Sequence, residues 1–592
     1  MAVVDIDPKG KHSRFCAESA VFAAEEQVKL EGGNKVSMGA VKVTKDTPPQ
    51  DLTAWEQRFV DACLKYATLY PEDKKVKDMI YRSAFMLYQK YRFEEASKSF
   101  QAVIAMDPRS KEAVLGANLI LDALAIKESW GPLKSTAKTF YDQEGLGNRK
   151  FKSEVYLIYQ NSTFKEVEVG FAADGDKSKA ADGFMAFYEE FGHEAENAAL
   201  ALNNSAAYYA QSNRVEDSMK VRHILIDDPN FGPKTKYYYD QIGFLGYDYE
   251  RIADADKAAF YYEKLWSLYP EEREDVDDEK KSDFDAKAAD AIYSAAVYRK
   301  GLGQWEQSIE DYNQFITAFP TDPRTADVKI RVGRIYEEKE KWQEAADVYS
   351  AYYRDPPEGS PLEFMSFARL HAGRSMDKLG KRRDRDKIYD DTVKLYSKYV
   401  EGGGAPGAHT EFVAEMMYEL AQPKLDEYLA LKIEGKGRGA SKKAEDKALT
   451  ASLQKKAKAL NETELAFTTV VQTGAGEWGL AALVSLGKAY ENMAQSLRTG
   501  AVPFYLTEDQ IELYSMAIED KAYVQDEKAV NAYDLALKKS YELTIYNENT
   551  AYATRSLGNL RPDDYPGLNE QLLEPRYTSS KSGKKYDFES SL

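Results

Sequence analysis

Two stretches of this chain repeat the same residue types at the same spacing. One reads Leu245-Gly246, Tyr249, Ala258, Tyr262 and Pro270, and the other reads Val332-Gly333, Tyr336, Ala345, Tyr349 and Pro357. In both stretches tyrosine follows the glycine by three positions, alanine by twelve and proline by twenty-four. A short unit that recurs in this way buries its apolar face only by stacking on its neighbours, so the pattern predicts a repeat architecture.

Each offset that the two stretches share has a physical reason. Small residues are needed where two helices cross closely, which places Gly246 and Gly333 on first helices and Ala258 and Ala345 on second helices. The tyrosines that follow them fill the space beside the crossing. The proline ends the second helix, because it has no N–H to donate and its ring does not fit inside a helix. The pattern therefore predicts helix–turn–helix units.

Weaker copies extend the pattern in both directions. The same offsets relate Ala84, Leu87, Ala96, Phe100 and Pro108, and also Ala296, Ser308, Tyr312 and Pro320. Partial matches occur within 180–192, 205–229 and 362–400. We predict about eight or nine hairpins between residues 51 and 400.

The pattern resembles the tetratricopeptide repeat (TPR), a helical hairpin of about 34 residues. This resemblance implies an all-α fold, a right-handed α-solenoid of helix–turn–helix repeats with a C-terminal long-helix segment. It also implies a concave groove that is lined by the first helices and binds other proteins.

Three repeat endings, "ATLYP", "WSLYP" and "ITAFP", are similar to those of bacterial envelope TPR proteins. Examples are the TPR lipoprotein of the outer-membrane β-barrel assembly machine and the periplasmic protein associated with the Tol–Pal system. The stretch 529–566 also resembles the end of large envelope TPR proteins, some of which serve gliding motility. The resemblance implies a scaffold in a cell-envelope assembly or motility complex; the alternative is a cytosolic TPR adaptor or co-chaperone-like protein.

The chain divides into four predicted parts. Residues 1–50 hold an N-terminal helix and a polar linker, and residues 51–400 form the solenoid. Residues 401–575 contain longer helices, near 410–433, 441–472, 478–498 and 508–547, and cover the last repeat face, as a solenoid requires. Residues 576–592 are polar and are predicted to be a disordered tail.

Charge and composition limit the partners and the compartment. The net charge of −18 argues against nucleic acid, because a phosphate backbone would be repelled. No apolar run is long enough for a transmembrane segment. The first twenty residues lack an apolar signal core, which favours a cytoplasmic protein. A periplasmic or outer-membrane-associated location is expected instead if an upstream signal is missing from this chain.

Signs of catalysis are few. The five histidines are scattered without the spacing of metal ligands. The glycine-rich segments 401–407 and 434–441 lack the lysine and hydroxyl of a phosphate-binding loop; the first is read as a linker and the second as a glycine-broken basic loop. We expect no enzyme activity, no cofactor, no metal and no catalytic residue.

The predicted binding site is the concave groove, whose exposed positions flank the packing glycines. Its candidate residues are Tyr247, Glu250, Tyr293, Lys300, Arg334, Glu337 and Arg374. Arginine and tyrosine are common in binding hot spots, so this string suits an extended peptide or a partner's helix. A solvated groove whose charges only keep the protein soluble is the alternative.

Overall fold

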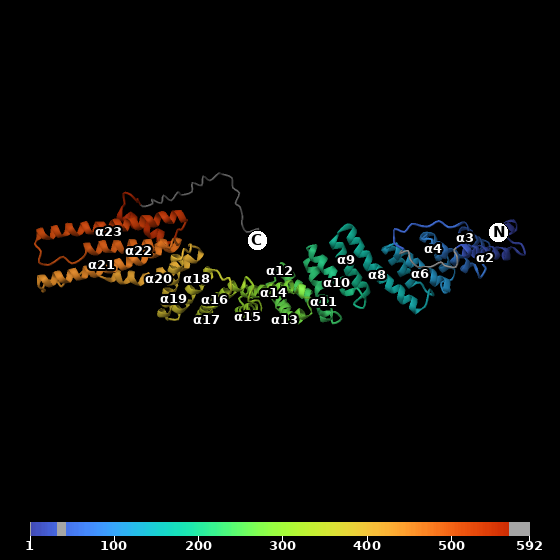
Figure 1. Ribbon diagram of the computed structural model, residues 1–592, viewed down its shortest axis with the longest axis horizontal. Helices are drawn as coiled ribbons and strands as arrows, with labels where there is room; N and C mark the ends of the chain where they lie inside the picture. The colour runs from blue at the N-terminus through green and yellow to red at the C-terminus, as the bar shows by residue number, and fades with distance from the viewer. Residues whose placement is uncertain (1, 32–42, 567–592) are drawn as a thin grey trace, which may run out of the picture. The chain divides into compact units, whose positions relative to one another are not determined.

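The computed structural model describes residues 2–31 and 43–566 (Figure 1). These residues form 24 α-helices and no β-strand, which confirms the all-α fold of helical repeats. Several helices begin at a polar capping residue. At the start of α3 (Ala54–Leu69), the N–H of Glu56 donates to the Thr53 hydroxyl and the N–H of Thr53 donates to the Glu56 carboxylate. Such reciprocal bonds satisfy two amide groups that have no partner within the helix.

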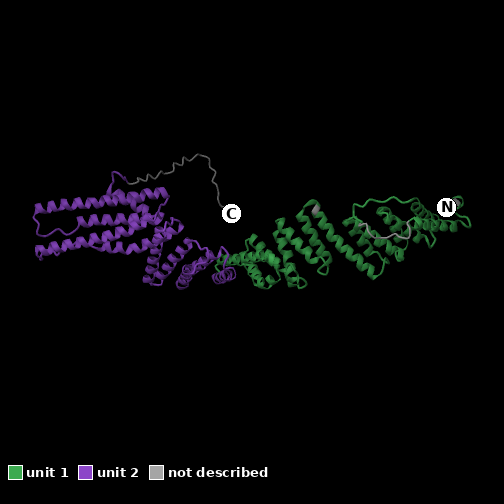
Figure 2. Cartoon of the chain, viewed as in Figure 1, with its two compact units in different colours: residues 1–304 green, residues 305–592 purple. Residues whose placement is uncertain are grey.

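Contacts divide the chain into two units, residues 1–304 and 305–592, which are described separately (Figure 2). The α-helices of the first unit are α1 (Ala2–Ile6), α2 (Ser13–Glu31), α3, α4 (Val76–Gln89), α5 (Phe93–Met106), α6 (Lys111–Ile126), α7 (Trp130–Asp142), α8 (Arg149–Asp174), α9 (Lys177–Phe191), α10 (Ala198–Gln211), α11 (Val215–Asp227), α12 (Tyr238–Arg251), α13 (Ala255–Glu272) and α14 (Lys281–Gly301).

The second unit begins with shorter helices and ends with long ones. Its helices are α15 (Trp305–Ala318), α16 (Thr325–Glu338), α17 (Trp342–Arg354), α18 (Leu362–Lys378), α19 (Arg382–Glu401), α20 (Ala408–Ala430), α21 (Lys442–Gln472), α22 (Gly476–Arg498), α23 (Glu508–Leu543) and α24 (Glu548–Leu560). The four long helices α20 to α23 lie close to the ranges that the sequence predicts.

The predicted domain boundaries stay predictions, although two observations bear on them. Helix α2 packs on α3 through Ala17, Val21 and Ala24, so the N-terminal helix is half of a hairpin. At the other end, α24 packs on α22 and α23 and buries Leu557. The predicted tail, residues 576–592, lies outside the described residues.

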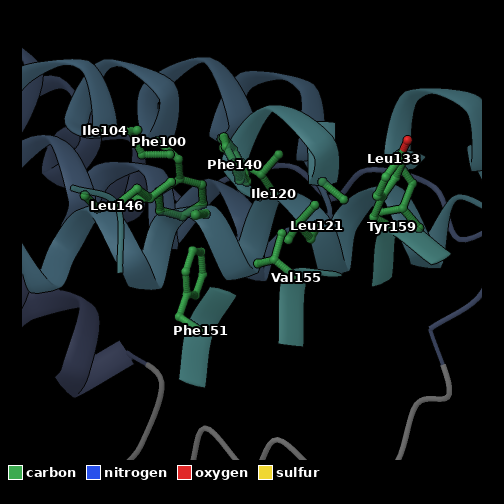
Figure 3. Packing of buried hydrophobic residues seen from close by; sticks show 14 of the residues in the cluster. Phe100, Ile104, Ile120, Leu121, Leu133, Phe140, Leu146, Phe151, Val155 and Tyr159 are labelled. Atoms are coloured by element: carbon green, nitrogen blue, oxygen red, sulfur yellow. The ribbon is translucent and has the colours of Figure 1, made fainter. Parts of the chain in front are cut away.

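Within each unit, each helix packs on the next one in the sequence, and side chains from successive helices meet in stacked apolar clusters. In the first unit, Phe100 of α5, Ile120 of α6, Phe140 of α7 and Val155 of α8 meet in one such cluster (Figure 3). This stacked core allows a long chain to bury apolar surface without one large globular centre.

The repeated glycines lie where a tyrosine ring of the following helix approaches. A Cβ atom on Gly246 would lie 2.7 Å from Cδ1 of Tyr262, and one on Gly333 would lie 2.6 Å from Cζ of Tyr349. The glycine therefore makes room for the aromatic ring, whereas the sequence suggested that it makes room for the small residue of the second helix. The same arrangement recurs at Gly373, whose Cβ would lie 2.8 Å from Cζ of Tyr389.

The long hairpin α22–α23 contains the same crossing. A Cβ atom on Gly487 would lie 2.6 Å from Cζ of Tyr533. Leu486, Tyr490 and Ala529 complete the repeat pattern, but Gly487 and Ala529 are 42 positions apart instead of 12. The hairpin is therefore a repeat with thirty additional residues between its two halves, which lengthen both helices.

Candidate functional site: an aromatic cavity between α12 and α14

A cavity of about 300 Å³ opens in the first unit, between α12 and α14. Its residues are Tyr239, Asp240, Gly243, Phe244 and Tyr247 of α12, Tyr262 and Leu265 of α13, and Lys287, Asp290, Ala291 and Ser294 of α14. Ligand sites are commonly concave, mainly apolar and edged by a few polar groups, and this cavity has that composition.

Helical periodicity brings the lining residues together. Asp240, Gly243, Phe244 and Tyr247 are spaced i, i+3, i+4 and i+7, so they share one face of α12. The lining residues of α14, from Lys287 to Ser294, follow the same spacing. The other face of α12 carries Ile242, Leu245 and Gly246, which are buried.

A glycine and a tyrosine shape the inside of the cavity. A Cβ atom on Gly243 would lie 3.5 Å from Leu265 Cδ1, an ordinary van der Waals contact, so a side chain at this position would enter the cavity without a clash at its Cβ. The Tyr262 hydroxyl donates to Glu250 Oε2 over 2.8 Å. Burial and this bond to a carboxylate both raise the pKa of Tyr262 well above its ordinary value. The phenol therefore stays neutral and fixed as part of the lining.

Two large aromatic side chains remain accessible at the site. Phe244 is 48% exposed and Tyr247 is 53% exposed, although both line the cavity. The Tyr239 hydroxyl is buried and lacks a hydrogen-bond partner in the described part of the chain. Lys287 and Asp290 contribute one charge of each sign. The cavity can therefore receive an apolar or aromatic side chain and offers polar groups beside it.

A buried polar network supports α12 from behind. Arg222 of α11 donates through Nε to Asp248 Oδ2 over 2.8 Å and through Nη1 to Gln241 Oε1 over 2.6 Å. Its guanidinium also lies 4.7 Å from the centre of the Phe244 ring. Burial lowers the pKa of Arg222, while the Asp248 carboxylate opposes that shift. These contacts join α11 to α12 beside Phe244. Removal of one charged partner would leave the other buried and unpaired, which is strongly destabilising.

The structure separates the predicted groove residues into different roles. Tyr247 lines the cavity, whereas Glu250 accepts the Tyr262 hydroxyl and is therefore part of the packing. Tyr293 and Lys300 are half-buried on α14. Of the predicted packing residues, Ala258 and Tyr262 are buried beside Gly246.

In the second unit, the predicted groove residues contact their own neighbours. The Arg334 guanidinium lies 4.6 Å from the centre of the Phe367 ring. Glu337 accepts the Tyr349 hydroxyl over 3.0 Å and contacts His371 Nδ1 at 2.8 Å.

In the second unit, Arg374 and the predicted packing residues also contact other parts of the same unit. Arg374 pairs with Glu415 of α20. Ala345 and Tyr349 are buried against the α16–α17 crossing, and Tyr336 is half-buried. A single groove that runs through both units stays a prediction.

Sequence reasoning missed Gly243, Phe244, Lys287 and Asp290. These residues could have been found from their i, i+3, i+4, i+7 spacing, which places them on one face of two consecutive first helices. Residues that share such a face can line a cavity as well as a groove. The described residues contain no group of three or more His, Cys, Asp and Glu side chains able to hold a metal ion. None of the described helices has the length and apolar character needed to cross a membrane.

One comparison with known protein families matches part of the repeat pattern. The tetratricopeptide repeat family matches residues 290–322, which cover part of α14 and all of α15. No curated protein matches the sequence. Among solved structures, the assembly chaperone of RpL4 (Acl4, residues 1–338) aligns with 45% of this chain and 99% of its own, at 11% identity and a TM-score of 0.23. Residues 290–322 therefore match one tetratricopeptide repeat.

Proposed function

We propose that this chain is a non-enzymatic TPR scaffold, and that its first unit binds an extended segment of a partner protein at the α12–α14 cavity. The proposal rests on two accessible aromatic side chains of α12, Phe244 and Tyr247. They lie beside an open cavity between α12 and α14, which are consecutive first helices. Aromatic side chains in a concave site provide large contact area and dominate many binding interfaces. The expected ligand segment inserts one apolar or aromatic side chain into the cavity.

The experiment starts from peptides selected from a random library on the intact protein. Selected sequences should share an aromatic or large aliphatic residue, because the cavity accepts such a side chain. Phe244→Ala should weaken their binding by about tenfold or more, the effect of losing one hot-spot side chain. Phe260→Ala is the matched control, since Phe260 lies on α13, is 51% exposed and does not line the cavity. Equal effects of the two substitutions would contradict the proposal.

The setting of this scaffold is a separate proposal. The repeat endings and the C-terminal stretch support a role in a bacterial cell-envelope assembly or motility complex, at the periplasm or the outer membrane. A cytosolic adaptor or co-chaperone-like protein is the alternative. Fractionation of cells that express the natural gene with a C-terminal tag distinguishes the two settings. Recovery in the periplasmic or outer-membrane fraction supports the envelope setting. Recovery in the cytosol supports the cytosolic adaptor.

A further inference from the structure

The first half of α23 exposes a stripe of acidic and apolar side chains. Asp509, Leu513, Met516, Asp520 and Val524 follow one another at helical spacing on one face, and all five are exposed. The exposed fractions are 68% for Leu513, 62% for Met516 and 51% for Val524. We call these five residues the acidic stripe. Large apolar side chains gathered on one exposed helix face indicate an interaction surface.

A basic segment lies on the neighbouring hairpin. It consists of residues 432–447 and carries the exposed side chains Lys432, Lys436, Arg438, Lys442, Lys443 and Lys447. The segment has a fixed shape, because Glu445 is buried and accepts the N–H groups of Lys436 over 2.6 Å and Gly437 over 2.8 Å. The segment holds six basic residues against three acidic ones, Glu434, Glu445 and Asp446, so it is basic in a protein whose net charge is −18.

Both features lie at the same end of the long-helix bundle. The α22–α23 loop contacts the basic segment: the Ala501 N–H donates to the Ile433 carbonyl over 3.2 Å, and Lys442 Nζ lies 5.2 Å from the centre of the Tyr505 ring. Helices α21 and α23 therefore begin at one tip (Figure 1).

The opposite charges at this tip do not neutralise each other within the chain. The six basic side chains form no ion pair in the described part of the chain, and neither do Glu508, Asp509, Glu512 and Asp520, which are exposed on α23. This tip thus carries acidic and basic side chains without an ion-pair partner in the described part of the chain, beside exposed apolar side chains. A second copy of the same chain supplies a complement to each of these groups.

We propose that two copies of this chain associate tip to tip about a two-fold axis, with the acidic stripe of each copy on the basic segment of the other. A two-fold interface is self-complementary, so the same two surfaces meet twice. Burial of Leu513, Met516 and Val524 under the aliphatic stems of the lysine and arginine side chains of the other copy provides the stabilisation, and the charges set the register. This proposal does not depend on the α12–α14 cavity.

The test is the mass of the intact protein in solution, measured by sedimentation equilibrium over a range of concentrations. We expect a reversible dimer whose Kd rises with salt, because the paired charges are screened. Two variants reverse one surface each: Lys442→Glu with Lys443→Glu, and Asp509→Lys with Glu512→Lys. Each variant alone should raise the Kd by about tenfold or more, because like charges then meet.

An equimolar mixture of the two variants gives the decisive result. In the mixed pair, both contacts join opposite charges again, so the dimer should re-form. Leu513→Lys should also dissociate the dimer, whereas Leu465→Lys on α21, also a highly exposed leucine at 71%, should not. A protein that stays monomeric at all concentrations, or variants that dimerise as well alone as in the mixture, would overturn the proposal.

Discussion

A Cβ atom on Gly333 would lie 2.6 Å from Cζ of Tyr349, so the ring occupies the space that any other side chain would need. Tyr349 is fully buried and donates to Glu337 of the same helix as the glycine. Because Gly246–Tyr262 and Gly487–Tyr533 show the same relationship, with Glu250 and Glu491 as acceptors, the crossing is one structural unit used several times.

The first prediction concerns this crossing. Gly333→Ala should destabilise the α16–α17 hairpin by about 1–3 kcal/mol, the cost of overpacking a filled core. Gly479→Ala is the control, because Gly479 lies inside α22 with open space around its Cβ position. It should be neutral or stabilise α22 by about 0.5–1 kcal/mol, since alanine favours a helix more than glycine does. Hydrogen exchange of each hairpin measures both effects, and equal losses would contradict the account.

The second prediction concerns the turn that follows the first helix. Glu340 has a φ of 55°, a left-handed conformation that is unfavourable for a residue with a Cβ, and Gly380 occupies the equivalent turn with a φ of 73°. Glu340→Gly should therefore stabilise the second unit by about 0.5–1 kcal/mol, and Gly380→Ala should destabilise it by a similar amount. Denaturant unfolding measures the stability of both variants. If both substitutions change the stability in the same direction, the turn conformation does not determine the effect.

The third prediction concerns a buried lysine in the long-helix bundle. Lys456 Nζ donates to the Leu431 carbonyl over 2.7 Å and to Asn492 Oδ1 over 2.8 Å, and the side chain has no exposed surface. Burial lowers the pKa of Lys456 to about 8 from its ordinary 10.5. Above pH 8 the folded chain releases this proton before the unfolded chain does, so stability should rise by about 1 kcal/mol from pH 8 to pH 9.

Urea unfolding at several pH values measures this effect. Lys456→Met should remove the rise between pH 8 and 9, because no titrating group remains at that position. A rise that persists in the variant would assign the pH dependence to another group.

The regular repeats could be predicted from sequence because Gly246 and Gly333 keep all their offsets to the later tyrosine and proline. The hairpin α22–α23 was expected, but its crossing at Gly487 was not, because thirty additional residues separate Gly487 from Ala529 and change the offset between them. The sequence could not show that Glu250 accepts a hydrogen bond from Tyr262, because this contact depends on where the Tyr262 hydroxyl lies in the folded chain. Phe244 was missed because the glycine-centred pattern marks helix crossings rather than cavity walls.

The measurement that tests the central claim most directly is calorimetric titration of the selected peptides into the wild-type protein and into Gly243→Leu. Leucine at position 243 would fill the cavity between α12 and α14 without meeting backbone, since the nearest atoms to its Cβ are Leu265 methyl groups at 3.5 and 3.6 Å. The account predicts a Kd raised by about tenfold or more, with helicity unchanged. Binding to Gly243→Leu as tight as binding to the wild type would contradict it.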